Sequence, residues 1–189
     1  IPPVKLFPHK SKCTKLVKFP IPGGISPVKL LSTYFRRSPL AIITQPEITS
    51  LKQLSGKTIF GFKEQLERGS IRELLNLYGV EPSSVNVTIA GNSVELFKTK
   101  RVAASLAYLT DEPYLLKQAD IPYRIFDPTQ FGIASLDLNL FTTRMFAESN
   151  PDLVDNFTEA ANKGWEYALA YPNEIIRVIK DKYDGQGKS

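Results

Sequence analysis

Cysteine and histidine are almost missing from this 189-residue sequence, which has one of each, Cys13 and His9. A single cysteine excludes an internal disulfide framework and any metal site built from several thiolates. A single histidine excludes a histidine-rich metal centre and argues against a Ser-His-Asp catalytic triad. The sequence therefore predicts a protein with no metal site and no cofactor.

Long hydrophobic runs are missing as well. No stretch approaches the roughly 20 apolar residues of a membrane helix, and no signal-peptide pattern is visible at the N-terminus. Hydrophobic residues nevertheless make up 42% of the chain, and a domain of this size buries roughly 70% of its unfolded surface. We therefore expect a globular α/β domain, and for an exported protein we expect the signal or membrane anchor to lie outside this chain.

Acidic residues are missing from residues 1–33, which carry six lysines and six of the 14 prolines. The whole chain has a formal charge of +5, so the remainder carries 5 − 6 = −1. The basic character thus belongs to one terminal segment and not to a folded face, which argues against a nucleic-acid partner. We expect an irregular basic N-terminal segment over 1–33, the alternative being an arm that binds phosphates or anionic lipid.

From Tyr34 onward, strand and helix patterns alternate. Apolar runs bounded by turn residues predict strands, and apolar residues at helical spacing predict the helices between them. The expected strands are Ser38–Thr44, Thr58–Gly61, Val85–Ile89, Val102–Leu109 and Pro122–Phe126. This alternation predicts a doubly wound parallel sheet with helices on both faces.

Local signals define the helices of this region. Ser50 with Gln53, and Ser70 with Glu73, form capping-box patterns at two helix starts. Gly79 supplies a helix stop after the second of them. The apolar face of that helix is expected to consist of Ile71, Leu74, Leu75 and Tyr78.

The pattern changes after residue 127. Asn139–Thr143 is a strand candidate, and Asn150 followed by Pro151 predicts the start of a helix that runs to about Ala170. Pro172 starts a final helix. We expect the first of these helices to bury the face formed by Leu153, Phe157, Ala160, Ala161, Gly164, Trp165 and Ala168.

Polar side chains follow the carboxyl ends of three expected strands, where open parallel sheets bind their ligands. They are Lys63, Asn92 and the run Thr110–Asp111–Glu112. Three of them also have a purely structural interpretation. Asp111 suits a helix cap, Glu112 an ordinary first-turn acid and Lys63 a solvated loop charge.

Four segments match a known family in order: SLKQLSGKTIFG (50–61), AYLTDEPYLLKQADIPYRIFDPTQFGI (107–133), NLFTT (139–143) and GWEYALAYPNEIIRVIKDKY (164–183). They resemble the sulfonate-binding and thiamine-pyrimidine-precursor family of type II periplasmic binding proteins. The subgroup most similar to them is the extracytoplasmic sensor of bacterial histidine kinases and cyclic-dinucleotide signalling proteins. The resemblance implies two α/β lobes joined by hinge strands, one of them incomplete in this chain. We expect 34–56 to be a hinge strand and connection, 57–126 the complete lobe, and 127–189 the return hinge with the helices of the partial lobe.

The resemblance further implies an extracytoplasmic, non-enzymatic domain that binds a pyrimidine or thiamine-related small molecule. Its partner would be a membrane sensor or an ABC-transporter module. In that role Glu112 would accept ligand N–H groups and Tyr108 would stack on the ligand, with core packing the alternative for Tyr108. The other functions considered are a degenerate domain kept for protein contacts and a thiamine-pyrimidine synthase, against which the scarcity of Cys and His argues.

The chain departs from the family pattern at two places. It has Lys100-Arg-Val-Ala-Ala104 where relatives usually read Gly-Lys-Val-Asp-Ala, and Asp137-Leu-Asn-Leu140 where they read Gly-Asp-Asn-Leu. The family's Thr-Asn-Glu-Pro loop is nearly kept, as residues 110–113.

Overall fold

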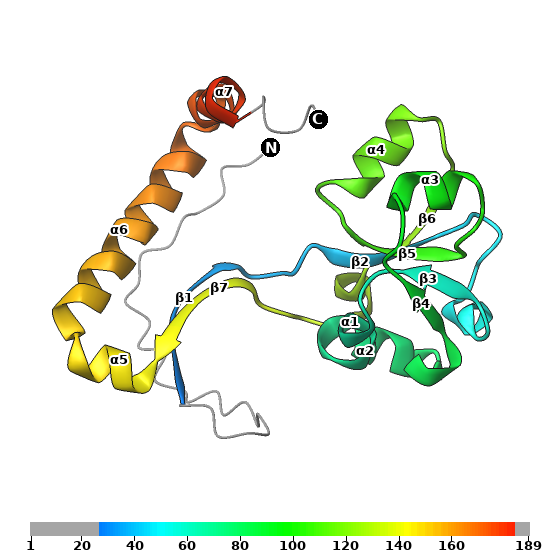
Figure 1. The fold of residues 1–189 in the computed structure, drawn as a ribbon, viewed down its shortest axis with the longest axis horizontal. Coiled ribbons are helices and arrows are strands. Elements are labelled where there is room, and N and C mark those ends of the chain that lie inside the picture. The colour runs from blue at the N-terminus through cyan, green and yellow to red at the C-terminus, as the bar shows by residue number, and fades with distance from the viewer. Residues whose placement is uncertain (1–26, 184–189) are drawn as a thin grey trace. The chain divides into compact units, whose positions relative to one another are not determined.

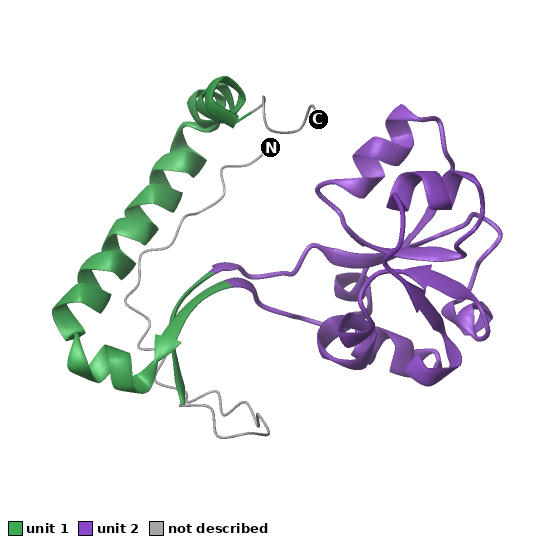
Figure 2. Ribbon diagram, in the orientation of Figure 1, with its two compact units in different colours: residues 1–33, 139–189 green, residues 34–138 purple. Residues whose placement is uncertain are grey.

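A computed structural model describes residues 27–183 of the chain. It divides into two compact units, one of residues 34–138 and the other of residues 1–33 with 139–189 (Figure 2). The basic segment over 1–26, with Cys13 and His9, lies outside the described residues.

The unit of residues 34–138 is built on a five-stranded sheet (Figure 1). In spatial order its strands are β4 (Asn86–Thr88), β3 (Thr58–Phe60), β5 (Ala104–Tyr108), β2 (Leu40–Thr44) and β6 (Arg124–Phe126). β3 runs parallel to β4 and β5, whereas β2 is antiparallel to both β5 and β6. The sheet is therefore mixed, which corrects the expectation of an all-parallel sheet. A buried apolar strand has the same sequence pattern in either direction, so the pattern did not reveal the orientation of β2.

Helices cover both faces of this sheet (Figure 1). Their bounds are α1 (Lys63–Glu67), α2 (Gly69–Leu77), α3 (Ser93–Lys98) and α4 (Glu112–Gln118), with 3₁₀ turns at Leu51–Leu54, Pro82–Ser84 and Pro128–Phe131. One core cluster joins Ile59 and Leu106 of the sheet to the buried face of α2. The other joins Ile43 and Ala107 to Phe97 of α3 and Leu116 of α4. The unit thus has a packed layer on each side of the sheet.

The expected face of α2 is confirmed for Ile71, Leu74 and Leu75, which are fully buried, whereas Tyr78 is half-buried and forms the C-cap. Gly79, at φ +65°, follows the end of the helix in the left-handed conformation that glycine adopts without strain. The expected cap at Ser70 is wrong: the helix begins at Gly69, and Ser70 is buried inside it. The reason is that α1 ends only two residues earlier, so the chain enters α2 before it reaches the serine.

The capping box at Ser50 is confirmed. Its Oγ accepts a hydrogen bond from the Lys52 N–H at 3.4 Å, and Gln53 Oε1 accepts from the Ser50 N–H at 3.0 Å. These bonds satisfy backbone donors that the first turn leaves unpaired. They start the short 3₁₀ helix that leads from β2 toward β3.

The described part of the second unit contains three helices, α5 (Arg144–Ser149), α6 (Pro151–Ala170) and α7 (Pro172–Tyr183). It also contains most of a two-stranded sheet of β1 (Val28–Phe35) and β7 (Asp137–Thr143), in which residues 34–35 and 137–138 belong to the other unit. Residues 28–33 are therefore part of a strand, which corrects the end of the segment that was expected to be irregular over 1–33; its residues 1–26 lie outside the described part of the chain. This strand forms by pairing with β7, more than 100 residues later, and its own sequence has no clean alternation. None of the helices within residues 27–183 is long and apolar enough to cross a membrane.

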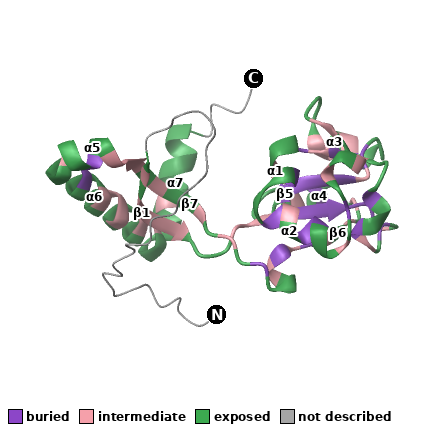
Figure 3. Ribbon diagram, turned by 90° about the horizontal axis from the view of Figure 1, so that it is seen from below, coloured by how far each residue is buried: buried purple, intermediate pink, exposed green. Residues whose placement is uncertain are grey.

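Burial in this second unit is sparse (Figure 3). Ala147 and Val154 are the only buried apolar side chains among its described residues. The expected buried face of α6 is therefore wrong in large part. Leu153, Phe157, Ala160 and Gly164 are exposed, while Ala161, Trp165 and Ala168 are half-buried. The helix has the amphipathic pattern of a packed element, but no described layer covers this side of it.

The two units also divide the chain differently from the expected segments 34–56, 57–126 and 127–189. β2 was expected to be a hinge strand, yet it lies between β5 and β6 in the sheet. Ile133 belongs to the core cluster of the same sheet. Without β2 the sheet would lose the strand that connects β6 to the rest, so the compact unit has to begin before residue 57.

Candidate ligand-binding site

The residues proposed from sequence all follow, or end, the three strands that run parallel. Lys63 comes after β3, Asn92 after β4, and Tyr108 ends β5 just before Thr110, Asp111 and Glu112. Since β3, β4 and β5 point the same way, these residues lie at one edge of the sheet. This edge, defined by the six residues, is here called the ligand edge.

Glu112 is the first residue of α4 and is half-buried. Its Oε2 accepts a hydrogen bond from the backbone N–H of Tyr108 at 2.8 Å. Within the described residues its other oxygen, Oε1, has no hydrogen-bond partner. The carboxylate is thus held in place through one oxygen, and the second can accept a further hydrogen bond.

Glu112 is one of the residues that line a small cavity. Its volume is about 10 Å³, enough for about one water molecule. Its polar lining residues are Ser93, Ser105 and Glu112, and its apolar walls include Ile43, Phe97 and Leu116. Sites for small organic ligands enclose roughly 300–1,000 Å³. This cavity is therefore too small to enclose an organic ligand.

The other proposed residues differ in their local roles. Asn92 caps α3, with its Oδ1 accepting the Glu95 N–H at 3.0 Å. Lys63 is exposed and forms an ion pair with Glu67, Nζ to Oε1 at 3.6 Å. Thr110 and Asp111 are exposed, and Asp111 makes no side-chain capping bond although it stands at the N-cap position of α4. The interpretation of Asp111 as a side-chain cap of this helix is therefore wrong.

Tyr108 is 46% exposed, so its ring is not packed in the core. Sequence reasoning did not select a second exposed aromatic residue at this edge, Phe62, which follows β3 and is 57% exposed. It also missed Ser105, a buried hydroxyl inside an apolar strand. Two sequence signals point to these residues. Ser105 is a polar residue within an apolar run, and Phe62 is an aromatic residue directly after an expected strand.

The backbone beside Phe62 is restricted by Gly61, which has φ +149°. A Cβ at this position would lie 2.7 Å from Leu106 Cδ1. Glycine therefore permits β3 and β5 to approach closely at the ligand edge.

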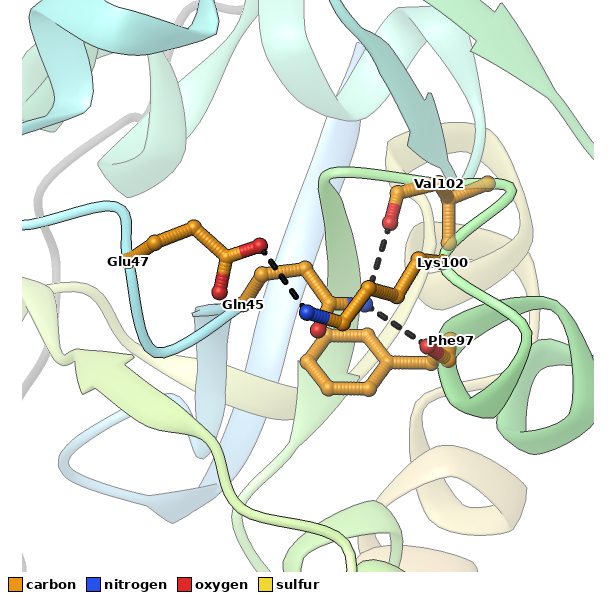
Figure 4. A network of polar contacts seen from close by, with 5 residues as sticks. All are labelled: Gln45, Glu47, Phe97, Lys100 and Val102. Carbon is orange, nitrogen blue, oxygen red and sulfur yellow. Dashed lines mark hydrogen bonds and ion pairs between the residues drawn. The ribbon is translucent and has the colours of Figure 1, made fainter.

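A polar network lies at the opposite edge, where β5 begins (Figure 4). Gln45, buried just after β2, donates from Nε2 to the carbonyl oxygens of Phe97 at 2.6 Å and Val102 at 3.3 Å. Lys100 Nζ lies 3.4 Å from Glu47 Oε1. A hydrogen bond from the Glu47 backbone, with the Lys100 ion pair, lowers the pKa of the Glu47 carboxyl. This network ties the end of α3 to β2, so its role is structural.

Among residues 27–183, no group of three or more His, Cys, Asp or Glu side chains could hold a metal ion. The chemistry available at the ligand edge is hydrogen bonding by a carboxylate and hydroxyls, together with contact to exposed aromatic rings.

Comparison with solved structures identifies the fold. The periplasmic aliphatic sulphonate-binding protein of Escherichia coli matches with TM-score 0.61 and 13% identity, over 82% of this chain and 54% of that one. A second match is the periplasmic sulfonate-binding protein of a putative sulfonate ABC transporter from Methylobacillus flagellatus KT. Its TM-score is 0.56 and its identity 16%, over 82% of this chain and 48% of that one. A histidine-bound ABC uptake transporter substrate-binding protein from Streptococcus pneumoniae matches with TM-score 0.51 and 16% identity, over 84% and 62%.

These neighbours are substrate-binding proteins and not enzymes, and the chain spans only about half the length of the first two. The expected fold class is confirmed: an α/β fold of the type II periplasmic-binding-protein kind with one complete lobe and one incomplete lobe. No curated protein sequence matches the chain. The model of the family described as NMT1/THI5 like matches residues 25–175, and the chain therefore belongs to the NMT1/THI5-like family.

Proposed function

We propose that this chain is part of an extracytoplasmic solute-binding protein and that its ligand edge contacts the solute. Two solved structures with this fold are described as substrate-binding proteins of ABC transporters, and a third as a periplasmic sulphonate-binding protein. The observation that carries the proposal is the anchored carboxylate of Glu112, with one oxygen bound to the chain and one available.

The charge of this group selects among ligand classes. A carboxylate accepts hydrogen bonds from N–H groups and repels anions. The one cation among the six proposed residues, Lys63, is already paired with Glu67. We therefore infer that the ligand presents N–H donors, as an aminopyrimidine related to thiamine does, and is not a sulfonate. The exposed ring of Tyr108 supports the same choice, because a flat heterocycle can stack on it.

The test is a calorimetric titration of the chain with the hydroxymethyl aminopyrimidine of thiamine and, separately, with ethanesulfonate. We expect heat from the pyrimidine only. Glu112→Gln should weaken pyrimidine binding by about 10- to 150-fold, the loss of a hydrogen bond to a charged acceptor. The glutamine keeps an oxygen for the Tyr108 N–H, so the melting temperature should stay nearly unchanged.

Glu73→Gln is the matched control, because Glu73 is an exposed carboxylate of α2, away from the ligand edge. It should leave affinity unchanged. Equal pyrimidine affinity in wild type and Glu112→Gln, or binding of ethanesulfonate instead, would contradict the assignment. Absence of binding by either probe would favour the degenerate domain.

For the membrane partner we propose an ABC-transporter module, in keeping with the transporter proteins that share the fold. A sensor module is the alternative. The coding sequence beside this chain distinguishes them, because a membrane span followed by a kinase segment would indicate a sensor.

A further inference from the structure

A small polar residue interrupts the apolar strand beside the candidate site. The other buried residues of β5 are apolar, whereas Ser105 is a serine that is only 4% exposed. In the sheet it pairs with Ile43 of β2 and with Phe60 of β3. Serine is much smaller than either neighbour, and the small cavity described above lies here, with Ser105 and Ile43 among its lining residues.

This cavity lies at the ligand edge, between the starts of α3 and α4. Ser93 and Glu112 are the first residues of these helices, and both line it. They directly follow Asn92 and Asp111, two of the residues that define the ligand edge. The cavity is partly open, and every residue that lines it belongs to the unit of residues 34–138. Its walls are therefore complete without the second unit.

The inside of the cavity is apolar, although three of its lining residues have polar side chains. The Ser105 hydroxyl donates to the carbonyl oxygen of Leu106 at 3.2 Å, and Glu112 Oε2 accepts the Tyr108 N–H. A buried water molecule needs about two to four polar partners, so water gains little in this place. A methyl group gains free energy by leaving water for an apolar cavity, and a volume of about 10 Å³ admits one such small group.

We propose, on the basis of the function inferred above for the ligand edge, that this cavity is a subsite for one methyl group of the ligand and that Ser105 sets its depth. Because Glu112 is part of its wall, the ligand presents an N–H donor and a methyl group close together, as a methyl-substituted heterocycle with N–H groups does. A ligand without the methyl group leaves the cavity unfilled, and a longer substituent does not fit. One methyl group in an apolar pocket raises affinity by about tenfold or more.

The test is a calorimetric titration of the whole chain with three pyrimidines. They are the hydroxymethyl aminopyrimidine of thiamine, which carries one ring methyl group, the same compound without that methyl group, and the same compound with an ethyl group in its place. Wild type should bind the methyl compound about tenfold more tightly than either of the others. Equal affinity for the compounds with and without the methyl group, with Glu112→Gln still weakening both, would overturn the subsite and leave the proposed function intact. Binding of none of the three would overturn both.

Ser105→Thr fills the cavity from the side of the protein. Threonine keeps the hydroxyl that donates to Leu106 and adds one methyl group, and its β-branched side chain suits a strand. The variant should bind the methyl compound about tenfold more weakly than wild type does, and the compound without the methyl group equally well, so that the preference disappears. Its melting temperature should be equal or higher, because the added methyl group fills existing space.

Ser70→Thr is the matched control, because it makes the same change at a buried serine of α2 that does not line the cavity. This variant should keep the preference for the methyl compound. A preference that survives Ser105→Thr, or a lower melting temperature of the Ser105→Thr variant, would overturn the proposal.

Discussion

Single residues with unusual backbone conformations are found at both places where the chain departs from its family's pattern. Lys100 and Leu138 have φ of +55° and +52°, a left-handed conformation that side chains other than glycine, asparagine and aspartate rarely adopt. The family usually has glycine at the first position and aspartate at the second, so each departure puts a poorly suited side chain into a left-handed residue. The departures could be read from sequence once the family was suspected, but the strain they cause is visible only in the dihedral angles.

Leu138→Asn should stabilise the protein. Asparagine tolerates the left-handed conformation, and Leu138 is 42% exposed, so little apolar burial is lost. The neighbouring Asp137 keeps the turn closed, because its carboxylate accepts from Ser38 Oγ and from the Leu138 N–H, both at 2.7 Å. We expect a gain of about 1 kcal/mol, or roughly 2–4 °C in melting temperature. Leu136→Asn, at an exposed leucine without positive φ, is the control and should give no gain. An equal shift for both variants would show that relief of strain is not the cause.

At the scale of elements, helices with strong local signals were predictable and their packing partners were not. Ile71, Leu74 and Leu75 repeat at helical spacing, and a helix with that face buried was both expected and found. The direction of β2 and the pairing of β1 with β7 depend on contacts between segments distant in sequence. Local periodicity carries no information about such pairing.

Gln45 shows how one side chain attaches an element to the sheet. Gln45→Met keeps the approximate size but removes the two hydrogen bonds to the carbonyl oxygens of Phe97 and Val102. Because these groups are buried, we expect a loss of about 1–3 kcal/mol. Gln53→Met makes the same change at an exposed residue, where the cost should be smaller. Urea denaturation of both variants measures the difference, and an equal loss at the two positions would contradict the anchoring role of Gln45.

At the scale of the whole molecule, the two units differ in how much core they contain. Apart from Ala147 and Val154, every buried apolar side chain among the described residues belongs to the unit of residues 34–138. Both core clusters lie in that unit and cover the two faces of its sheet. A unit with its own core on both sides of a sheet has what an independent domain requires.

A fragment of residues 34–138 should therefore fold by itself. We expect a cooperative thermal transition and slow amide hydrogen exchange in β2, β3 and β5. In the whole chain, amides of α6 and α7 should exchange faster than those of the sheet, because few buried contacts hold these helices. Circular dichroism and hydrogen-exchange mass spectrometry provide both measurements. A fragment that remains unfolded would mean that the second unit contributes essential stability.

The sequence by itself determined the α/β class and the position of most helices and strands, and its resemblance to a known family led to the periplasmic-binding-protein fold. The elements follow from local periodicity and capping residues, and the grouping of the six candidate residues at one edge follows from their places after parallel strands. Tertiary structure alone decided that Glu112 is anchored by the Tyr108 N–H, that β2 runs antiparallel within the sheet, and that the apolar side of α6 is exposed. The physical reason is the same in each case. An amphipathic pattern states that a face favours burial, but only the arrangement of the other segments decides what covers it.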